Sequence, residues 1–284
     1  MPCISVTKCH GTGNDFILLD ARAGPELPYA HVARTLCRRR FAIGADGLLV
    51  VSDPHKTSAD VAMRAFNPDG SEAEMCGNGV RCVARYLYQQ NPQQTAARIE
   101  TMAGMIETKI VDAHGHVNVQ VAMGEPRFHG GPSGLLDRTL RLGDEIAPAY
   151  AVSMGNPHVV VVTSREPVDL DLESAAAEVQ TWKIFDSPPN VELAKFAGDE
   201  IRMRVHERGV GETWACGTGA CAAAAVAIAC ARATSPVMVT TKGGSVRIAW
   251  SGPGHSAVLT GDAELVFRTD VELPAQAGVA AHGR

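Results

Sequence analysis

An internal repeat constrains the fold of this 284-residue chain more than any other feature of its sequence. At an offset of 140, residues 61–84 align with residues 201–224, and seven of the 24 paired positions are identical. The identical pairs are Met63/Met203, Arg64/Arg204, Glu72/Glu212, Cys76/Cys216, Gly77/Gly217, Gly79/Gly219 and Ala84/Ala224. Self-similarity at a fixed spacing marks a repeated structural unit. Because the offset is close to half the length of the chain, we interpret the sequence as a duplication that encodes two similar domains.

Both copies show the same order of local patterns. An alternation of apolar residues with a period of two, typical of a half-buried strand, is followed by a polar loop that contains glycine. The sequence Cys-Gly-x-Gly comes next, and helix-forming residues follow at 80–90 and 220–232. Further helices are predicted at 31–40 and 172–181, among many short strand-like runs. These patterns predict an α+β fold of two pseudo-symmetric domains, each with a cysteine at the start of a helix.

Composition narrows the class of function. The 26 basic and 31 acidic residues give a net charge of −5, which argues against nucleic acid as a partner. The longest apolar run, residues 220–231, has 12 residues, fewer than the about 18 that a membrane helix needs. Residues 1–10 contain no apolar secretory segment. We therefore expect a cytoplasmic protein with no membrane partner.

The eight cysteines are too few for a disulfide-rich scaffold in a chain of this length. No Cys-x-x-Cys pair occurs, so no metal site is predicted. A thiol at a helix N-terminus differs from a structural thiol, because unpaired N–H groups and the helix dipole lower its pKa. The same groups favour a bound carboxylate.

Two such thiols in duplicated settings predict a cleft in which Cys76 and Cys216 face a ligand from opposite sides. This arrangement suits inversion at a carbon next to a carboxylate. One thiolate would remove the α-proton, and the other thiol would deliver a proton to the opposite face. The helix N-termini would stabilise the negative charge that develops on the carboxylate.

Seven motifs spread over nearly the whole chain occur in a specific order and spacing. They are His10-Gly11-Thr12-Gly13-Asn14-Asp15-Phe16, Gly44-Ala45-Asp46-Gly47, Phe66-Asn67-Pro68-Asp69-Gly70-Ser71, Met75-Cys76-Gly77-Asn78-Gly79-Val80-Arg81, Met154-Gly155-Asn156-Pro157-His158, Asn190-Val191-Glu192 and the run 206–219. Together they resemble the diaminopimelate epimerase family, cofactor-independent enzymes of lysine and cell-wall precursor synthesis.

The resemblance implies a protein that interconverts LL- and meso-2,6-diaminopimelate and needs no cofactor. Cys76 and Cys216 would be the acid/base pair, with His158 and Glu207 in support. The substrate-binding residues that it implies are Asn14, Asn67, Gly77, Asn78, Asn156, Asn190, Glu207, Arg208, Gly217 and Thr218. Gly47 stands where some members carry a glutamine that reaches the substrate, so this sequence departs from those members there.

The resemblance also implies how the domains are built. In each domain strands wrap around a central helix, the active site lies in the cleft between the domains, and the protein is a homodimer. The N-terminal domain would comprise residues 1–122 and a returning strand at about 263–272, and the C-terminal domain would comprise residues 123–262. Residues 273–284, rich in proline, alanine and glycine, are predicted to form a flexible tail.

The residues alone leave other functions open. A two-thiol racemase for proline-type or histidine-type substrates would use the same cleft, although Glu207 and Arg208 favour a substrate with a polar distal end. A thiol hydrolase would need one indispensable cysteine. A ligand-binding or redox-sensing module would close a disulfide between Cys76 and Cys216 without turnover. Nucleotide binding is not predicted, because residues 11–13 lack the third glycine of the dinucleotide motif and no P-loop sequence occurs.

Overall fold

Two β-rich halves make up residues 3–73, 76–113 and 116–273, which the computed structural model describes. The first half contains β1 (Cys3–Gly11), β2 (Asn14–Asp20), α1 (Tyr29–Leu36), β3 (Gly47–Ser52), β4 (Val61–Phe66), β5 (Glu72–Ala73), α2 (Gly77–Gln90), β6 (Ala96–Thr101), β7 (Gly104–Ala113) and β8 (His116–Ala122). The second half contains β9 (Arg127–His129), β10 (Leu135–Leu142), β11 (Glu145–Ser153), β12 (Pro157–Val162), η1 (Pro167–Asp169), α3 (Leu172–Gln180), β13 (Asn190–Ala197), β14 (Glu200–Glu207), β15 (Gly211–Thr213), α4 (Gly217–Ala229), β16 (Val237–Thr241), β17 (Gly244–Ala249) and β18 (Val258–Asp262). The last strand, β19 (Glu264–Glu272), returns to the first half.

The strand pairing of the first half is repeated in the second. β2 lies parallel to β3 as β12 does to β13, and β4 lies parallel to β6 as β14 does to β16. The registers repeat as well, because Ala65 pairs with Ala73 and Val205 pairs with Thr213, a shift of 140 at both positions. The duplication predicted from the sequence is therefore confirmed at the level of strand register.

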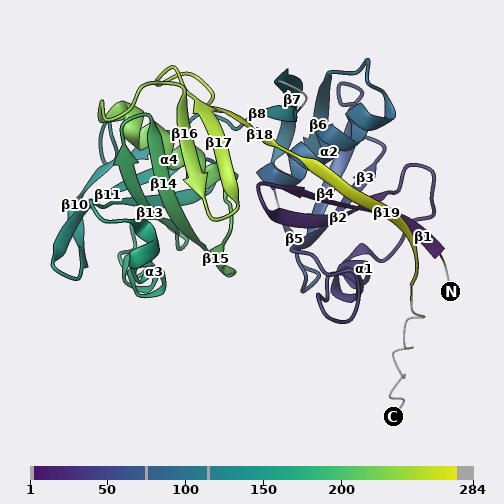
Figure 1. Ribbon diagram of the computed structural model, residues 1–284, viewed down its shortest axis with the longest axis horizontal. Coiled ribbons are helices and arrows are strands. Elements are labelled where there is room, and N and C mark those ends of the chain that lie inside the picture. The colour runs from purple at the N-terminus through teal and green to yellow at the C-terminus, as the bar shows by residue number, and fades with distance from the viewer. Residues whose placement is uncertain (1–2, 74–75, 114–115, 274–284) are drawn as a thin grey trace, which may run out of the picture.

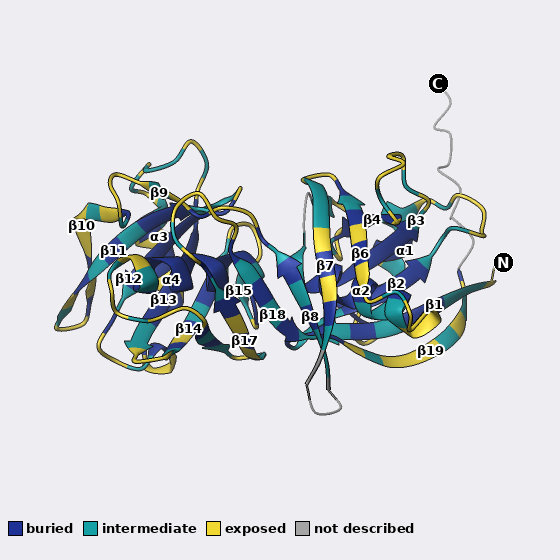
Figure 2. Ribbon diagram, turned by 90° about the horizontal axis from the view of Figure 1, so that it is seen from above, coloured by how far each residue is buried: buried dark blue, intermediate teal, exposed yellow. Residues whose placement is uncertain are grey.

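Each half surrounds one helix with strands. α2 contacts β1, β7 and β8 among others, and α4 contacts strands from β11 to β18. Every residue from Thr218 to Ala227 of α4 is buried, and Figure 2 shows this helix inside the second half. A helix that is apolar on all sides belongs in a core, and its many alanines let strands approach closely from every direction. Cys82 and Cys221 are fully buried in this core.

Two strand pairings join the halves. β8 runs antiparallel to β18, with Ala122 opposite Val258. After β18 the chain crosses to the first half, where β19 runs antiparallel to β1 from Glu264 opposite His10 to Glu272 opposite Cys3. Figure 1 shows β19 as the long yellow strand that extends from the second half across the first. The first and last described strands are thus neighbours.

The helices differ in their bounds from the sequence prediction. α1 ends at Leu36 rather than at residue 40, because the Arg38 carbonyl accepts from the backbone N–H groups of Phe41 and Ala42 in a separate turn. α2 and α4 begin three residues earlier than predicted, at Gly77 and Gly217. Glycine is a poor helix former, so propensity alone misses these first turns. Of the predicted tail 273–284, all but Leu273 lies outside the described residues.

Candidate active site

Each of the repeated cysteines is the N-cap residue of its helix. Cys76 precedes α2 with φ −140° and ψ 101°, and Cys216 precedes α4 with φ −125° and ψ 113°. The backbone N–H of Gly79 donates to Cys76 Sγ at 3.4 Å, and Cys216 Sγ lies 3.4 Å from Thr218 Oγ1. Both thiols therefore lie where the N–H groups and the positive dipole end of a helix are available to an anion.

The starts of the two helices meet at Met123, which directly follows β8. A Cβ atom built on Gly77 would lie 3.1 Å from Met123 Cε, and one built on Gly217 would lie 3.5 Å from the same carbon. Met123 is only 4% exposed. One methionine side chain thus lies against the first residue of both helices, so the N-termini that follow Cys76 and Cys216 come together between the halves.

The second glycine of each Cys-Gly-x-Gly motif is required by close packing. A Cβ atom on Gly79 would lie 2.7 Å from Leu49 Cδ2, and one on Gly219 would lie 2.5 Å from Glu192 Oε1. A side chain at either position would have to displace a buried neighbour, because these separations are shorter than van der Waals contact. Both copies therefore have glycine here because a buried side chain, Leu49 or Glu192, packs against the first helical turn.

Burial raises the pKa of both thiols, whereas the sequence predicted that their pKa would be lowered. It raises the pKa of the Cys76 thiol to about 12, although the Gly79 N–H lowers it. Burial also raises the pKa of Cys216 well above its usual value, and the charges of Glu207 and Glu192 raise it further. The predicted lowering of the pKa by the helix N-termini is therefore outweighed by desolvation. Both thiols are protonated near neutral pH in this arrangement.

Glu207 lies at the end of β14 and influences both cysteines. Thr213 Oγ1 donates to Glu207 Oε1 at 2.5 Å. Burial raises the pKa of the Glu207 carboxyl, while hydrogen bonds from Thr213 and Cys216 lower it. The charge of Glu207 in turn raises the pKa of Cys76 and of Cys216. A buried carboxyl group in this position disfavours a thiolate on either side.

A chain of contacts through two side chains links His158 to Cys216. Its Nδ1 lies 2.7 Å from Glu192 Oε1, and its Nε2 lies 3.1 Å from Asn156 Oδ1. Asn156 Nδ2 donates to Thr218 Oγ1 at 3.4 Å, which orients the amide so that its oxygen accepts from His158 Nε2. One proton then lies between His158 Nδ1 and the fully buried carboxyl group of Glu192. This chain of bonds ends at Thr218, next to the Cys216 thiol.

Strand register explains how these groups come together. β12 and β13 are parallel, with His158 opposite Asn190. Asn190 and Glu192 are two residues apart on β13, so their side chains lie on the same face of the sheet. Asn190 Oδ1 accepts from the backbone N–H of Arg208 at 2.9 Å, which fixes the chain where β14 ends.

The predicted residues of the first half are arranged around the start of β2 and the end of β4. Asn14 Nδ2 donates to Asp46 Oδ2 at 2.9 Å, and Asn14 Oδ1 accepts from Asn78 Nδ2 at 3.1 Å. Asn67 follows β4 as Arg208 follows β14, and its Nδ2 donates to Ser71 Oγ at 2.9 Å. The halves therefore present comparable polar groups at comparable positions, with different side chains.

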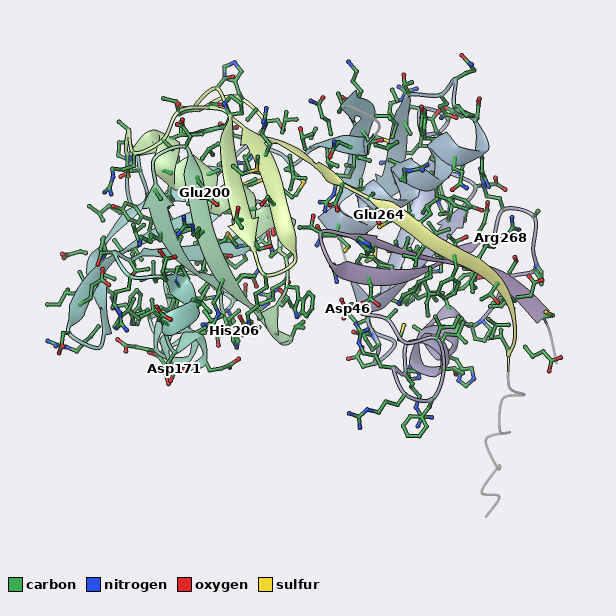
Figure 3. The ribbon with its side chains drawn as sticks, viewed as in Figure 1. Asp46, Asp171, Glu200, His206, Glu264 and Arg268 are labelled. Carbon is green, nitrogen blue, oxygen red and sulfur yellow. The ribbon has the colours of Figure 1, made fainter. Side chains whose placement is uncertain are left out.

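Gly47 cannot carry a side chain toward a ligand in this fold. A Cβ atom there would lie 2.9 Å from the Phe66 carbonyl oxygen and 3.4 Å from the Phe16 ring. The neighbouring residue, Asp46, holds Asn14, and in Figure 3 it lies on the side of the first half that is turned toward the second. Glycine at position 47, where some family members carry glutamine, is thus packed closely against the backbone of Phe66.

Sequence reasoning assigned no role to Met123, Asp46 or Glu192. For Glu192 a signal existed, because its spacing of two from Asn190 in a strand-like run predicts a shared face. Nothing in the sequence indicates that Met123 separates two helix starts, since that contact depends on how the halves meet. Within the described ranges, no helix is long and apolar enough to cross a membrane, and no three His, Cys, Asp or Glu side chains form a candidate metal site.

Comparison with known proteins identifies the family. A family model described as "Diaminopimelate epimerase" matches residues 6–129 and 150–266. The chain belongs to the diaminopimelate epimerase family. The diaminopimelate epimerase of Pelotomaculum thermopropionicum is 43% identical over 278 residues, which cover 92% of this chain and 96% of that protein. The diaminopimelate epimerase of Halothermothrix orenii is 40% identical over 276 residues, which cover 93% and 96%.

Solved structures of more distant proteins share the fold of this family member. A phenazine biosynthesis protein of the PhzF family from Bacillus anthracis matches with a TM-score of 0.70 at 18% identity, over 96% of this chain and all of that one. A hydroxyproline epimerase from Agrobacterium vitis, with bound trans-4-hydroxy-L-proline, matches with a TM-score of 0.68 at 17% identity, over 95% and 91%. The predicted fold class of two duplicated α+β domains is therefore confirmed.

Proposed function

We propose that this member of the family is a diaminopimelate epimerase. It interconverts LL- and meso-2,6-diaminopimelate without a cofactor, in the formation of lysine and peptidoglycan precursors. The observation that carries the proposal is the pair of helix N-termini, following Cys76 and Cys216, that meet at Met123 between duplicated halves. Relatives about 40% identical over more than nine-tenths of the chain are named for this activity.

The reaction needs one thiolate and one thiol. The thiolate takes the α-proton, and the electron pair of the broken C–H bond passes into the adjacent carboxylate. The opposite thiol then gives its proton to the other face of the carbon. The first cysteine ends as a thiol and the second as a thiolate, so atoms and charge balance and no electron acceptor is needed.

The raised pKa values of the two thiols fit this chemistry. A thiolate whose pKa is raised by burial is a stronger base toward the weakly acidic α-proton. Forming it requires that one proton leave the pair, which N–H groups at the starts of α2 and α4 favour. The same N–H groups stabilise the charge that develops on the substrate carboxylate. Water exclusion around the thiols strengthens these interactions.

The remaining predicted residues hold the two ends of the substrate. Arg208 can bind a carboxylate with two parallel hydrogen bonds, and Glu207 can face an ammonium group. Asn67, Asn156 and Asn190 offer donors and acceptors to both kinds of group. A substrate with an amino acid group at each end uses all of these, whereas proline has no polar distal end.

The test is proton NMR of LL-diaminopimelate in D2O with reduced protein and no added cofactor. We expect the α-proton signal to disappear while the meso isomer forms. A folded, reduced protein that exchanges no α-proton of this substrate would contradict the proposal. Exchange of proline or histidine instead would assign the same two-thiol cleft to another amino acid.

Cysteine variants test the two-base mechanism. Cys76→Ala and Cys216→Ala should each lose epimerisation, by at least about 10²-fold, since each removes one of two acid/base groups. Cys221→Ala is the matched control, because this buried thiol lies in α4 but away from its N-cap. If only one of Cys76 and Cys216 proved indispensable, a thiol hydrolase type of chemistry would fit better.

The family resemblance also supports a homodimer in the cytoplasm, and we include both in the proposal. Sedimentation equilibrium of the reduced protein measures the first. A mass of one chain at micromolar concentration would contradict a stable dimer.

A further inference from the structure

The side chain of Asn78 uses both of its amide hydrogens within the protein. Asn78 Nδ2 donates to Asn14 Oδ1 at 3.1 Å and to the Ala215 carbonyl oxygen at 3.1 Å. A carboxamide has two N–H hydrogens, so none remains for a ligand. The Ala215 carbonyl can only accept, which fixes the orientation of the amide and leaves Oδ1 near Gly217. Asn78 is 5% exposed.

The two acceptors belong to different halves of the molecule. Asn14 begins β2 in the first half, whereas Ala215 directly precedes Cys216 in the second. Asn78 itself lies two residues after Cys76, in the first turn of α2. One carboxamide therefore connects the segments that carry the two reactive cysteines. The bond from Asn78 to the Ala215 carbonyl is buried, so it is costly to break, because the separated groups would not be rehydrated.

The equivalent residue of the second half makes no such connection through its described contacts. Thr218 occupies the position that corresponds to Asn78 at the offset of 140. Its Oγ1 contacts Asn156 Nδ2 and Cys216 Sγ, and both belong to the second half. Asn78, whose side chain is longer, thus makes one bond within its own half, to Asn14, and one to the other half, to Ala215.

Asn14, which accepts from Asn78, is itself held by a network of charged side chains. Asn14 donates to Asp46, and Arg39 donates to Asp46 at 2.6 Å and to Asp15 at 2.5 Å. Lys8 also donates to Asp15. Asn14 therefore cannot turn away from Asn78 without breaking its own bond to a fixed carboxylate. The bonds extend without interruption from this network through Asn14 and Asn78 to Ala215.

We propose that Asn78 is a positioning residue whose side chain sets the separation of Cys76 and Cys216 by tying the segment before Cys216 to the first half. Both of its amide hydrogens are used within the protein, so the side chain donates no hydrogen bond to substrate, and the backbone N–H of Asn78 remains for that role. The inference rests on the proposed function for its effect on catalysis. Its effect on the separation of the thiols does not depend on that function.

Asn78→Thr is the most informative variant, because it installs the residue found at the equivalent position 218. Its hydroxyl can bond within the first half but is too short to bond Asn14 and Ala215 at once. Asn78→Ala removes both bonds. Asn78→Asp keeps the size and cannot donate when ionised, and it replaces Asn78→Ala if that variant does not fold.

The separation of the thiols is read with dibromobimane, which becomes fluorescent when it bridges two thiols, and the bridged peptides are identified by mass spectrometry. Dividing the bridging rate by the rate of single alkylation with monobromobimane removes differences in thiol reactivity. We expect this ratio to fall about tenfold in Asn78→Thr and Asn78→Ala, since a shift of about 1 Å is enough to misalign reacting groups. Thr108→Val, which breaks the bond from Thr108 Oγ1 to the Ala97 carbonyl oxygen within the first half, should leave the ratio within about twofold of wild type.

Kinetics separate positioning from substrate binding. For Asn78→Thr we expect kcat to fall by about 10–100-fold while KM changes less than about threefold, because misplaced thiols affect only the proton transfers. A raised KM with unchanged kcat would show that the side chain binds substrate and would overturn the inference. An unchanged bridging ratio would overturn it as well. If the wild type does not epimerise diaminopimelate but the ratio still falls, the inference stands and the proposed function fails.

Discussion

Cys76 and Cys216 are subject to two opposing influences. Each lies at a helix N-terminus, which favours a thiolate, and each is surrounded by protein, which disfavours it. Desolvation prevails, and for Cys216 the nearby carboxyl groups of Glu207 and Glu192 add to it. The resting protein therefore keeps both thiols protonated near neutral pH.

The rate of alkylation of Cys76 by iodoacetamide measures this effect. In Cys216→Ala protein we expect the rate to rise about tenfold per pH unit from about pH 7 to 9, because the pKa of about 12 lies above this range and the thiolate fraction grows with pH throughout it. The same thiol in urea-unfolded protein, with a pKa near about 8.5, should level off toward the top of that range. A plateau below pH 9 in the folded protein would mean that the helix N-terminus outweighs burial.

The placement of Cys76 and Cys216 at the starts of two equivalent helices could be predicted from the sequence, but the contacts around them could not. Their identity in both copies and their place before a helix are local patterns. The bonds of Asn78 and the position of Met123 depend on how the halves meet, which no periodicity records. The raised thiol pKa was missed for the same reason, since burial is a property of the folded molecule.

At the scale of elements, the same pair of Arg–Glu hydrogen bonds occurs in both strand-turn-helix units, the one that ends in α2 and the one that ends in α4. Arg64 donates two hydrogen bonds to Glu72, at 2.6 and 2.7 Å, and Arg204 donates two to Glu212, at 2.7 and 2.9 Å. Each pair holds β4 against β5, or β14 against β15, just before the cysteine that caps the next helix. This explains why both copies of the repeat have arginine at the first of these positions and glutamate at the second. The sequence alone shows this identity but not its cause.

Replacing Glu212 should reveal what its hydrogen bonds contribute to stability. Arg204, together with Lys242, lowers the pKa of Glu212 to about 2. A lowered pKa means that the ionised carboxylate stabilises the fold above the unfolded pKa, near about 4.5, and that this stability is lost as pH falls through about 2. Glu212→Gln should lower the free energy of unfolding by about 1–2 kcal/mol at pH 7, with allowance for solvent screening.

Urea unfolding at pH 7 and at about pH 3.5 checks this prediction, because the difference between wild type and Glu212→Gln should shrink at the lower pH. Glu72→Gln is the matched control in the first half. Its partner Arg64 is 42% exposed, against 15% for Arg204, so we expect a smaller loss. A difference that does not depend on pH would show that the charge of Glu212 is not its source.

At the scale of the whole molecule, a buried guanidinium joins three distant parts of the chain. Arg81 of α2 donates to Thr12 Oγ1 at 2.6 Å and to the Asp262 carbonyl oxygen at 2.9 Å. Thr12 donates from its backbone N and its Oγ1 to Asp262 Oδ1, at 3.0 Å each. Thr12 has φ 53°, a conformation that costs a threonine about 1–3 kcal/mol and that these bonds offset.

Arg81→Met should lower the free energy of unfolding by about 3 kcal/mol, because buried acceptors lose a charged donor. Arg81→Lys keeps the charge and should lose less. Hydrogen exchange with mass spectrometry should show faster exchange in the β1–β2 turn and where β18 meets β19, with β10 and β11 unchanged. Uniformly faster exchange would contradict a local role for this network.

Of all features of the fold, the arrangement of the whole molecule was the least predictable from local sequence patterns. The repeat predicted two similar units, and their pairing is now described strand by strand. The pairing of β19 with β1 joins residues some 260 positions apart, and such a contact leaves no local pattern. The family resemblance, not periodicity, implied a returning strand. The domain boundaries at residues 122 and 262 stay a prediction, as does the homodimer.

The pairing of β19 with β1 has a consequence for synthesis of the protein. A ribosome releases β1 first and its neighbour β19 last, and β8 also waits for β18, which is made long after it. While the second half is being made, two strands of the first half therefore present unpaired backbone edges, which are prone to join other chains. We expect the first half to reach its native stability only after the last strand has emerged, so that the part translated earliest is completed latest.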